Sequence, residues 1–261
     1  MADTIPSLGG PGLARIEPED RLVVLARTLQ APDSDAADAL AANVGRWERF
    51  GETCLGQALY AHRAVFRGAS DVPAWSHLEL SYFRDMVPAE VIRELVLSPS
   101  ATGLLRAELL LTTPSSFVLP QDWSGAAARP DRQASLEYID VDAPYLADYR
   151  DIMRTYIGPA AAKLVQAGRI GTFRTMETAA VLHHDPSFAI SWNQIHLCEV
   201  PADGFNGFGQ EFDAALREVA PDGGFTAVFS GLDSMRTIPR WTFNACVVEE
   251  DAALARVGAG A

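Results

Sequence analysis

Two short segments of this chain have titratable side chains at alternating positions, as a strand would present them. They read WSHLEL (residues 75–80) and WNQIHL (residues 192–197). Successive side chains of a strand point to opposite faces, so one face of each segment is apolar and the other carries a tryptophan and polar groups. The expected polar faces are Trp75, His77 and Glu79 in the first segment, and Trp192, Gln194 and His196 in the second.

These polar faces are suited to acid–base chemistry on a small molecule. Histidine exchanges a proton near neutral pH because its unperturbed pKa is about 6.5. A carboxylate such as Glu79 can orient an imidazole, and a tryptophan beside it can cover a flat aromatic or enol substrate. The competing interpretation of each histidine is a hydrogen-bonded core residue or a solvated strand end. The expected catalytic residues are His196, His77 and Glu79, and the expected substrate-binding residues on the same strands are Trp192, Gln194 and Trp75.

Two arginines in the preceding strands can complete such a site. When the two halves are laid on each other at their tryptophans, His62-Arg63 is placed opposite Phe173-Arg174. A guanidinium can hold an enolate, a phenolate or a carboxylate as negative charge develops. We therefore expect Arg174 to be catalytic and Arg63 to bind substrate. The alternative is that both arginines pair with surface acids, since the chain has 34 aspartates and glutamates.

The segment HHDPS (residues 183–187) is a predicted hairpin tip, because Asp-Pro is common in turns. A solvated turn is the expected structure. The alternatives are a His-Asp dyad at a pocket mouth, which makes His184 a candidate substrate-binding residue, and a haem or metal ligand. Adjacent strand residues point to opposite faces, so His183 and His184 are not expected to bind one ion together.

The sequence has none of the spacings that commonly hold metals or nucleotides. The motifs HxH, HxxxH and HExxH are absent, and so are GxGxxG, GxxxxGK[ST] and the nucleophile motif GxSxG. Cys54, Cys198 and Cys246 are far apart and form no CxxC pair, so they are expected to be small buried apolar side chains. Neither a metal nor a cofactor is therefore expected.

Hydrophobic periodicity and turn residues divide the chain into two similar blocks. Residues 21–120 are predicted to form one β-α-β-β-α-β unit, and residues 134–250 another. Residues 121–133 contain glycine, proline and small residues without periodicity, and are interpreted as a linker. The end segments 1–20 and 251–261 are expected to be flexible.

Helices of unequal length are expected in the two blocks. In the first, Ala-rich content and helical spacing predict a helix over residues 36–59, and a second helix begins at Pro88. In the second, a helix over residues 144–168 is expected to kink at Gly158-Pro159. One further helix is predicted over residues 208–220.

The repeated element order resembles the dimeric α+β barrel superfamily, in which two ferredoxin-like units pair their sheets into a barrel. Some members are dimers, and others fuse both units in one chain. The resemblance covers about Arg21 to Glu250, and it rests on element order and length. The weak repeat of WSHLEL and WNQIHL, whose tryptophans are 117 residues apart, agrees with the repeated element order. Two unrelated α+β segments that share a tryptophan by chance are the alternative. A cone-shaped SnoaL-like or NTF2-like fold is disfavoured because helices and strands alternate in both halves.

The resemblance implies an α+β class with antiparallel sheets, but it does not select one chemistry. Family members include cofactor-free monooxygenases, lactone isomerases, polyketide cyclases, dehydrochlorinases and haem enzymes such as chlorite dismutase. Among these, the histidines and the missing cofactor motifs favour a cofactor-independent lyase, isomerase or cyclase that acts on a small aromatic or polyketide-like substrate. The alternatives are a haem enzyme of the same fold and a non-catalytic carrier of a small apolar ligand.

The charge of the chain excludes some partners. Its formal net charge is -13, so nucleic-acid phosphate and anionic membrane surfaces would repel it. The N-terminal segment lacks the basic and apolar regions of a signal peptide, and no apolar run reaches the ~20 residues of a membrane span. We therefore expect a cytoplasmic protein whose partner is a small aromatic or apolar molecule, with no nucleic acid and no membrane. A homodimer is as compatible with the sequence as a monomer.

Overall fold

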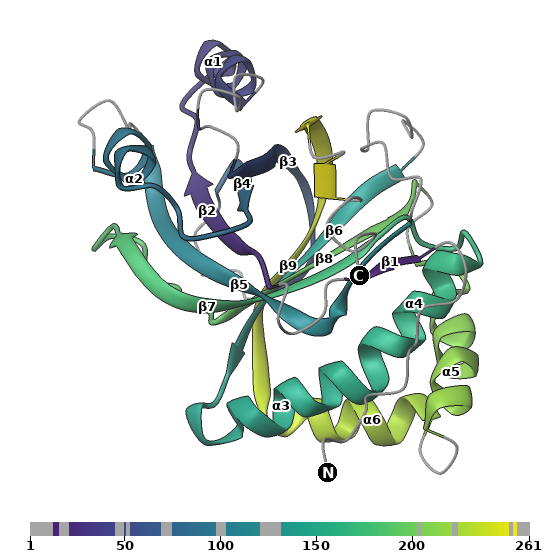
Figure 1. Cartoon of the computed structure of the whole chain (residues 1–261). Coiled ribbons are helices and arrows are strands. Elements are labelled where there is room, and N and C mark those ends of the chain that lie inside the picture. The colour runs from purple at the N-terminus through teal and green to yellow at the C-terminus, as the bar shows by residue number, and fades with distance from the viewer. Residues whose placement is uncertain are drawn as a thin grey trace.

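The two predicted units close into one barrel in a computed structural model of the chain, with helices on its outer surface (Figure 1). The structure describes residues 13–15, 21–44, 50, 53–68, 75–97, 103–120, 132–202, 205–220, 224–250 and 253–254. Its strands are β1 (Leu13–Arg15), β2 (Val23–Leu29), β3 (Cys54–Gly68), β4 (His77–Phe83), β5 (Leu104–Pro120), β6 (Arg132–Val141), β7 (Phe173–His184), β8 (Gln194–Pro201) and β9 (Arg236–Glu250).

Six α-helices and two shorter helical segments are described. The first unit contains α1 (Ser34–Val44) and α2 (Ala89–Leu95). The second contains the 3₁₀ helix η4 (Ala143–Tyr145), α3 (Leu146–Ile152), the π-helical turn η5 (Met153–Ile157), α4 (Gly158–Gln166), α5 (Phe208–Val219) and α6 (Gly224–Asp233). None of the helices in the described part of the chain has the length and hydropathy that a membrane span requires.

The sheet has the same strand order in each unit. The first unit runs β5-β2-β4-β3 and the second runs β9-β6-β8-β7, and every pairing is antiparallel. The pairings β3–β9 and β5–β7 join the units and close the barrel. The predicted α+β class and the repeated β-α-β-β-α-β order are therefore confirmed. The tryptophans lie at equivalent places, since Trp75 precedes β4 by two residues and Trp192 precedes β8 by two.

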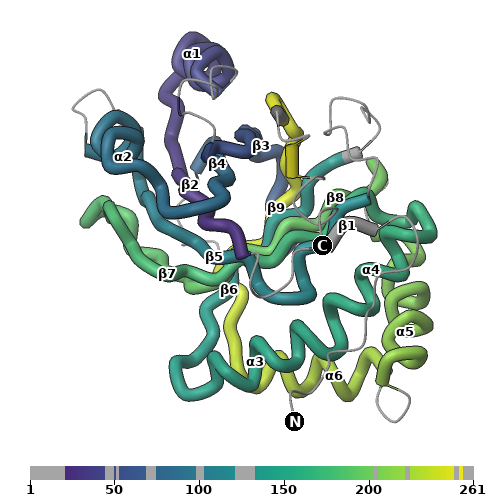
Figure 2. The backbone as a smooth tube through the Cα atoms, viewed as in Figure 1, coloured from purple at the N-terminus to yellow at the C-terminus, as the bar shows by residue number. Residues whose placement is uncertain are grey.

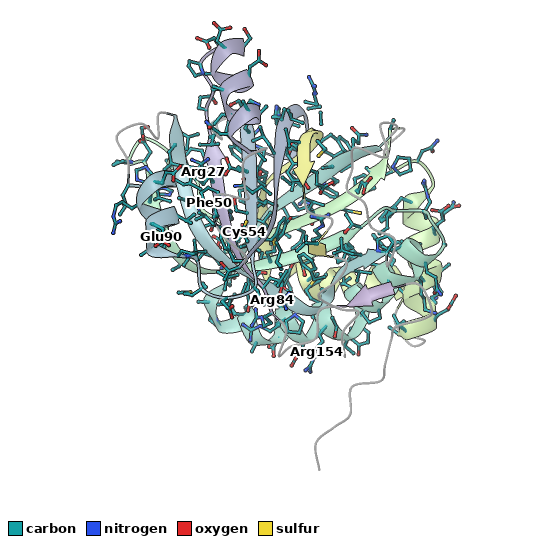
Figure 3. The ribbon with its side chains drawn as sticks, turned by 45° about the horizontal axis from the view of Figure 1, so that its top comes forward. Arg27, Phe50, Cys54, Arg84, Glu90 and Arg154 are labelled. Carbon is teal, nitrogen blue, oxygen red and sulfur yellow. The ribbon has the colours of Figure 1, made fainter. Side chains whose placement is uncertain are left out.

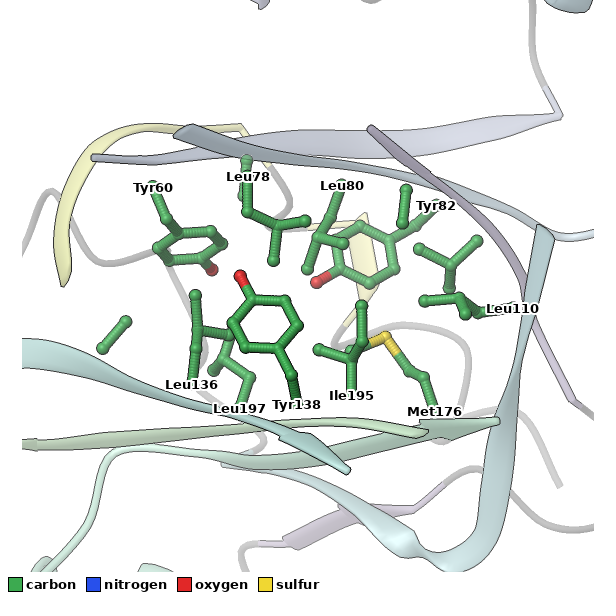
Figure 4. Packing of buried hydrophobic residues seen from close by; sticks show 14 of the residues in the cluster. Tyr60, Leu78, Leu80, Tyr82, Leu110, Leu136, Tyr138, Met176, Ile195 and Leu197 are labelled. Carbon is green, nitrogen blue, oxygen red and sulfur yellow. The ribbon is translucent and has the colours of Figure 1, made fainter. Parts of the chain in front are cut away.

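The barrel interior is the main core, and both units contribute to it. Leu78 and Leu80 of β4 face Ile195 and Leu197 of β8 across the barrel (Figure 4), as the apolar faces of the two strands predict. All four side chains are almost fully buried. Burial of apolar surface at about 25 cal/mol per Å² makes this interior a major source of stability. The opposite faces of β4 and β8 therefore point out of the barrel toward the helices.

Helices cover the outer face of the second unit more fully than that of the first. Figures 1 and 2 show α3, α4, α5 and α6 packed together below the sheet, whereas α1 stands apart at the far end. The predicted long helix is interrupted by η5 directly before Gly158-Pro159, where proline cannot donate a backbone hydrogen bond. A Cβ at Gly158 would lie 2.1 Å from the Ser115 carbonyl oxygen, so only glycine allows the helix to approach β5 this closely.

Several predicted boundaries are wrong because tertiary pairing overrides local propensity. The helix predicted over 36–59 ends at Val44 in α1, residues 45–49 lie outside the described residues, and Cys54 begins β3, which both β4 and β9 pair. The helix α6 was not predicted. The predicted linker also ends earlier than expected, because β6 begins at Arg132. Its residues 121–131 lie outside the described residues.

Short stretches of both end segments contact the barrel. The strand β1 pairs with the last residues of β5, from Val118 to Pro120. At the other end, Leu254 is fully buried in the barrel core. Backbone pairing in one case and apolar burial in the other hold these segments in place.

Candidate functional site

A cavity of about 220 Å³ lies between the outer face of the second unit's sheet and its helices. The sheet strands β6, β7, β8 and β9 form one side, and residues of α4, α5 and α6 form the other. Eight aromatic side chains line it, which makes most of its surface apolar. They are Phe66, Phe173, Phe205, Phe208, Phe212, Phe225, Phe229 and Trp241.

Three ionisable groups from three adjacent strands interrupt this apolar lining. Glu137 of β6 is paired across the sheet with His196 of β8 on one side and with Trp241 of β9 on the other. The third group is Arg236, at the start of β9. The sheet therefore places a carboxylate, an imidazole and a guanidinium on one wall of an aromatic cavity.

His196 is a neutral imidazole in this setting. Its side chain is buried, and burial together with the nearby Arg236 lowers its pKa to about 3. Its Nδ1 is 3.8 Å from Oε2 of Glu137. The negative carboxylate favours the Nδ1–H tautomer, which leaves a lone pair on Nε2. This Nε2 has no hydrogen-bond partner among the described residues, so it is available to a ligand.

Glu137 and Arg236 form an electrostatic pair around the imidazole. Burial raises the pKa of Glu137, and Arg236 and Arg67 oppose that rise. Arg236 donates a hydrogen bond of 2.9 Å from Nη1 to Oη of Tyr149, and its Nη2 lies 3.5 Å from Asp233. Its Nε is buried without a partner in the described part of the structure. One guanidinium N–H is thus able to donate a hydrogen bond to an anionic or carbonyl oxygen.

The cavity does not match the requirements of a metal or haem centre. Among the described residues, no three His, Cys, Asp or Glu side chains converge on a metal site. Of the described lining residues, His196 and Cys198 are of types that serve as axial haem ligands. At about 220 Å³ the cavity is also smaller than the ~300–1,000 Å³ typical of pockets for drug-sized ligands, and haem is larger still. A haem group does not fit the arrangement of side chains found here.

The other residues predicted on β8 are not in the cavity. Gln194 is on the same side of the strand as His196, but it does not line the cavity. Trp192 was predicted to share that face, and this is wrong. It precedes the strand, so the alternation of faces does not reach it, and it packs in the barrel core with Trp75 at a ring distance of 5.6 Å. Its indole N–H donates to Glu108 at 2.7 Å.

His77 and Arg63 lie together in the first unit, far from His196 in the fold. They line an open groove of about 520 Å³ between α1 and the strands β3 and β4, which Trp75 also borders. The hydroxyl of Ser76 donates to the Leu29 carbonyl at 3.1 Å, so it must accept the 2.8 Å hydrogen bond from His77 Nδ1. Burial and the nearby Arg63 lower the pKa of His77. The groove therefore holds a neutral, oriented histidine at neutral pH.

Glu79 does not orient His77, which corrects the predicted catalytic pair. Its buried carboxylate forms an ion pair with Arg27 and accepts a 3.4 Å hydrogen bond from the Gln57 amide. Arg27, which is labelled in Figure 3, also donates to the Leu95 carbonyl of α2 at 3.1 Å. A buried carboxylate and a buried guanidinium both lose hydration, and their attraction offsets part of that cost. The carboxylate of Glu79 is therefore paired with the guanidinium rather than with the imidazole.

Arg174 is inside the barrel rather than in the cavity, so its predicted catalytic position is wrong. It is fully buried and donates 2.9 Å and 3.1 Å hydrogen bonds to Tyr82 and Glu249. Its neighbour Phe173 points the other way and lines the cavity. The predicted equivalence with Arg63 is also wrong. Arg174 pairs with Leu197 and Ala58 pairs with the equivalent Leu80, so Ala58 is its counterpart.

His184 is exposed at the end of β7, outside both the cavity and the groove. Its ring is 5.9 Å from Phe188, and its backbone pairs with Arg106. The predicted turn begins two residues later than expected. Asp185 accepts hydrogen bonds of 2.8 Å and 2.6 Å from the backbone and hydroxyl of Ser187, which lowers its pKa. The solvated turn is thus confirmed at Asp185, and His184 does not meet a ligand site.

Sequence reasoning missed most of the cavity lining. Glu137 alternates with Leu136 and Tyr138 in the sequence, so its outward position could have been predicted. Arg236 was not among the predicted site residues. The phenylalanines did give a signal. They form two groups, one before residue 213 and one after residue 224, and within each group their spacing of three or four residues marks one face of a helix. They are Phe205, Phe208, Phe212, Phe225 and Phe229.

Comparison with known proteins supports the fold. No family model and no curated protein sequence matches the chain. A protein described as anthrone oxidase-like has a TM-score of 0.55 at 12% identity, with 92% of this chain and 96% of that chain covered. A candidate monooxygenase of Fusobacterium nucleatum has a TM-score of 0.54 at 9% identity, with 88% and 94% covered. The chain has the dimeric α+β barrel fold with both units in one polypeptide, as the sequence resemblance implies.

Proposed function

We propose that this protein is a cofactor-independent enzyme that uses His196 to move a proton on a small aromatic or polyketide-like molecule. The observation that carries the proposal is the buried Nε2 of a neutral imidazole, without a partner among the described residues, in a cavity lined by aromatic rings. Most buried polar atoms have a hydrogen-bond partner, and the exceptions are explained by ordered water, by strain or by a ligand or catalytic role. The description of one structural neighbour as anthrone oxidase-like gives an aromatic substrate a precedent in this fold.

The proposed step is a proton transfer from a phenolic or enolic O–H, or from a C–H beside a carbonyl, to Nε2 of His196. The substrate becomes an anion and the imidazole becomes a cation. Glu137, beside Nδ1, stabilises the cation. The Nε–H of Arg236, which has no partner among the described residues, can donate a hydrogen bond to the anionic oxygen. The histidine is by itself a weak base, because its pKa is about 3. The new opposite charge beside it raises its basicity as the transfer proceeds.

The aromatic lining has two effects on this chemistry. It provides flat apolar surfaces that stack on or edge against an aromatic ring. It also excludes water, which strengthens each electrostatic interaction inside the cavity. A lyase, isomerase or cyclase reaction can follow from the same first proton transfer.

A non-catalytic carrier is the second candidate function, because most of the lining is apolar. An apolar ligand would then be held by ring contacts alone. The two candidates differ in their dependence on His196, since a carrier of apolar ligands does not need a proton acceptor.

The test is a matched pair of variants assayed on hydroxylated aromatic ketones, with products identified by mass spectrometry. His196→Gln should lower turnover by about 10²–10⁴-fold, because an acid–base group typically contributes that much. His77→Gln, in the groove of the first unit, is the control and should retain turnover. Full activity in a folded His196→Gln protein would refute the proposal. Ligand binding without turnover in the wild type, unchanged in this variant, would support the carrier. The absorbance spectrum of purified protein tests for haem independently.

A further inference from the structure

The mouth of the cavity in the second unit is partly built by a strand of the first unit. The strand β3 pairs with β4 only as far as Ala61, opposite His77. Beyond that point it pairs with β9 alone, as far as Gly68 opposite Arg240. Figure 2 shows β3 and β9 side by side where the units meet. We call residues 62–68 the β3 arm.

Phe66 on the β3 arm closes the apolar lining of the cavity. Its ring centroid lies 4.6 Å from that of Trp241, 5.5 Å from Phe243 and 5.8 Å from Phe205, all at steep interplanar angles. It is nevertheless 53% exposed, which is unusual for a phenylalanine with three ring contacts. One side of the ring therefore packs on the cavity wall while the remainder meets solvent at the mouth.

The neighbouring residue shows that this exposure is not a general property of the arm. Val65 is similarly exposed, at 46%, but it does not line the cavity. It pairs with Thr242 on β9. The arm thus has one residue that borders the cavity next to one that does not, and both can be changed without opening the barrel core.

We infer that Phe66 is a specificity-determining residue, which limits the size of the aromatic ligand that the cavity admits. The inference rests on the proposed function of the same cavity. The ring lies at the solvent-exposed edge of a cavity of about 220 Å³, so a ligand that extends past this edge meets it and a shorter ligand does not. Removing the ring opens that side of the cavity toward solvent, and the longer ligand gains room that the shorter one does not use.

The experiment compares two rigid probes, 2-naphthol and 2-hydroxyanthracene, which differ by one fused ring. Their dissociation constants are measured by fluorescence titration with the wild type, Phe66→Ala and Val65→Ala. Wild-type protein should prefer 2-naphthol. Phe66→Ala should shift the ratio of the two constants toward 2-hydroxyanthracene by about tenfold or more, the usual discrimination of an apolar pocket for added bulk. Val65→Ala should leave the ratio unchanged.

The outcomes separate this inference from the proposed function. An unchanged ratio in folded Phe66→Ala overturns the role of Phe66, while loss of turnover in His196→Gln would still support catalysis in the cavity. The converse result, a shifted ratio with full turnover in His196→Gln, keeps Phe66 as a size limit and removes the proposed chemistry. If neither probe binds the wild type, the size limit is overturned. Equal melting temperatures of the two arm variants show that the barrel is intact.

Discussion

The two units place different side chains at the same positions of the same fold. In the first unit Arg27 of β2 is paired across the sheet with Glu79 of β4, and in the second Glu137 of β6 is paired with His196 of β8. These pairs are equivalent, because Leu80 and Leu197 occupy corresponding positions in β4 and β8. Glu79 directly precedes the first leucine, and His196 directly precedes the second. The outer face of one sheet therefore carries an ion pair where the other carries a carboxylate and a neutral imidazole.

The neighbours of each pair differ in the same sense. In the first unit, Gln57 donates to Glu79 and to Ser81, so these side chains form a polar cluster, in which Arg27 Nε and Gln57 Oε1 have no partner among the described residues. The positions equivalent to Gln57 and Ser81 are Phe173 and Cys198, which line the cavity. A cluster of polar side chains occupies these positions in one unit, and the lining of an aromatic cavity occupies them in the other.

The ends of β3 and β7, which pair with strands of the other unit, differ in the same way. The β3 arm brings Phe66 to the open cavity of the second unit. By the pairing of β7 with β5 and of β3 with β9, the equivalent residue on β7 is Leu182. It packs against the filled core beneath α2. The fold thus sets the positions of these two residues. The side chains around them determine whether each packs in a core or borders a cavity.

The largest expected effect is on the ion pair of the first unit. Glu79→Ala leaves Arg27 buried without its counter-charge, so we expect the free energy of unfolding to fall by about 3–5 kcal/mol. Urea denaturation measures it. Lys163→Ala is the control, because it breaks the exposed ion pair with Glu218 and should cost at most about 1 kcal/mol. Equal losses in the two variants would contradict the structural role of the buried pair.

Installing the first unit's pair in the second sharpens the comparison. The double variant Glu137→Arg with His196→Glu should fold, since the first unit accommodates this pair at equivalent positions. It removes the proton acceptor and fills part of the cavity, so turnover should fall by about 10²-fold or more. Titration with 2-naphthol and circular dichroism report binding and fold. Retained turnover in the folded double variant would show that the cavity is not the site of chemistry.

The pH dependence of stability offers a smaller, signed effect. His196 has a pKa of about 3 in the folded protein and about 6.5 when unfolded. Between these values the unfolded chain binds a proton that the folded protein does not, so stability falls as the pH decreases through this window. The contribution approaches about 1.4 kcal/mol per pH unit for one group. Urea unfolding from about pH 7 to about pH 4 should show a shallower loss in His196→Gln than in the wild type. Parallel curves would mean that His196 is not buried and neutral.

The smallest effect is expected at the end of β7. His183 is half-buried beside the turn at Asp185, away from the cavity and the groove. Substitutions outside the core, cavities and polar networks usually change stability by no more than about 0.5 kcal/mol. The melting temperature and the turnover of His183→Gln should therefore both match the wild type. A marked loss of turnover would show that this end of the barrel takes part in function.

The sequence alone determined the element order, the repeat and the face of the strand on which His196 lies. Alternation in WSHLEL and WNQIHL depends only on the period of a strand, which is local, so the apolar faces were predicted correctly. The same reasoning placed His196 on the outer, polar face. It could not place Trp192, because the alternation ends where the strand ends, and strand ends are set by pairing.

Tertiary structure alone decided which polar groups meet. Glu79 was expected to serve His77, but the register of β2 against β4 brings Arg27 to it, and a buried carboxylate binds the nearest guanidinium. Arg174 has the right chemistry for a catalytic arginine, yet one step along β7 turns it into the barrel and Phe173 into the cavity. Which polar side chains pair depends on cross-strand register and on which helices cover a face. Neither can be predicted from the spacing of residues along one strand.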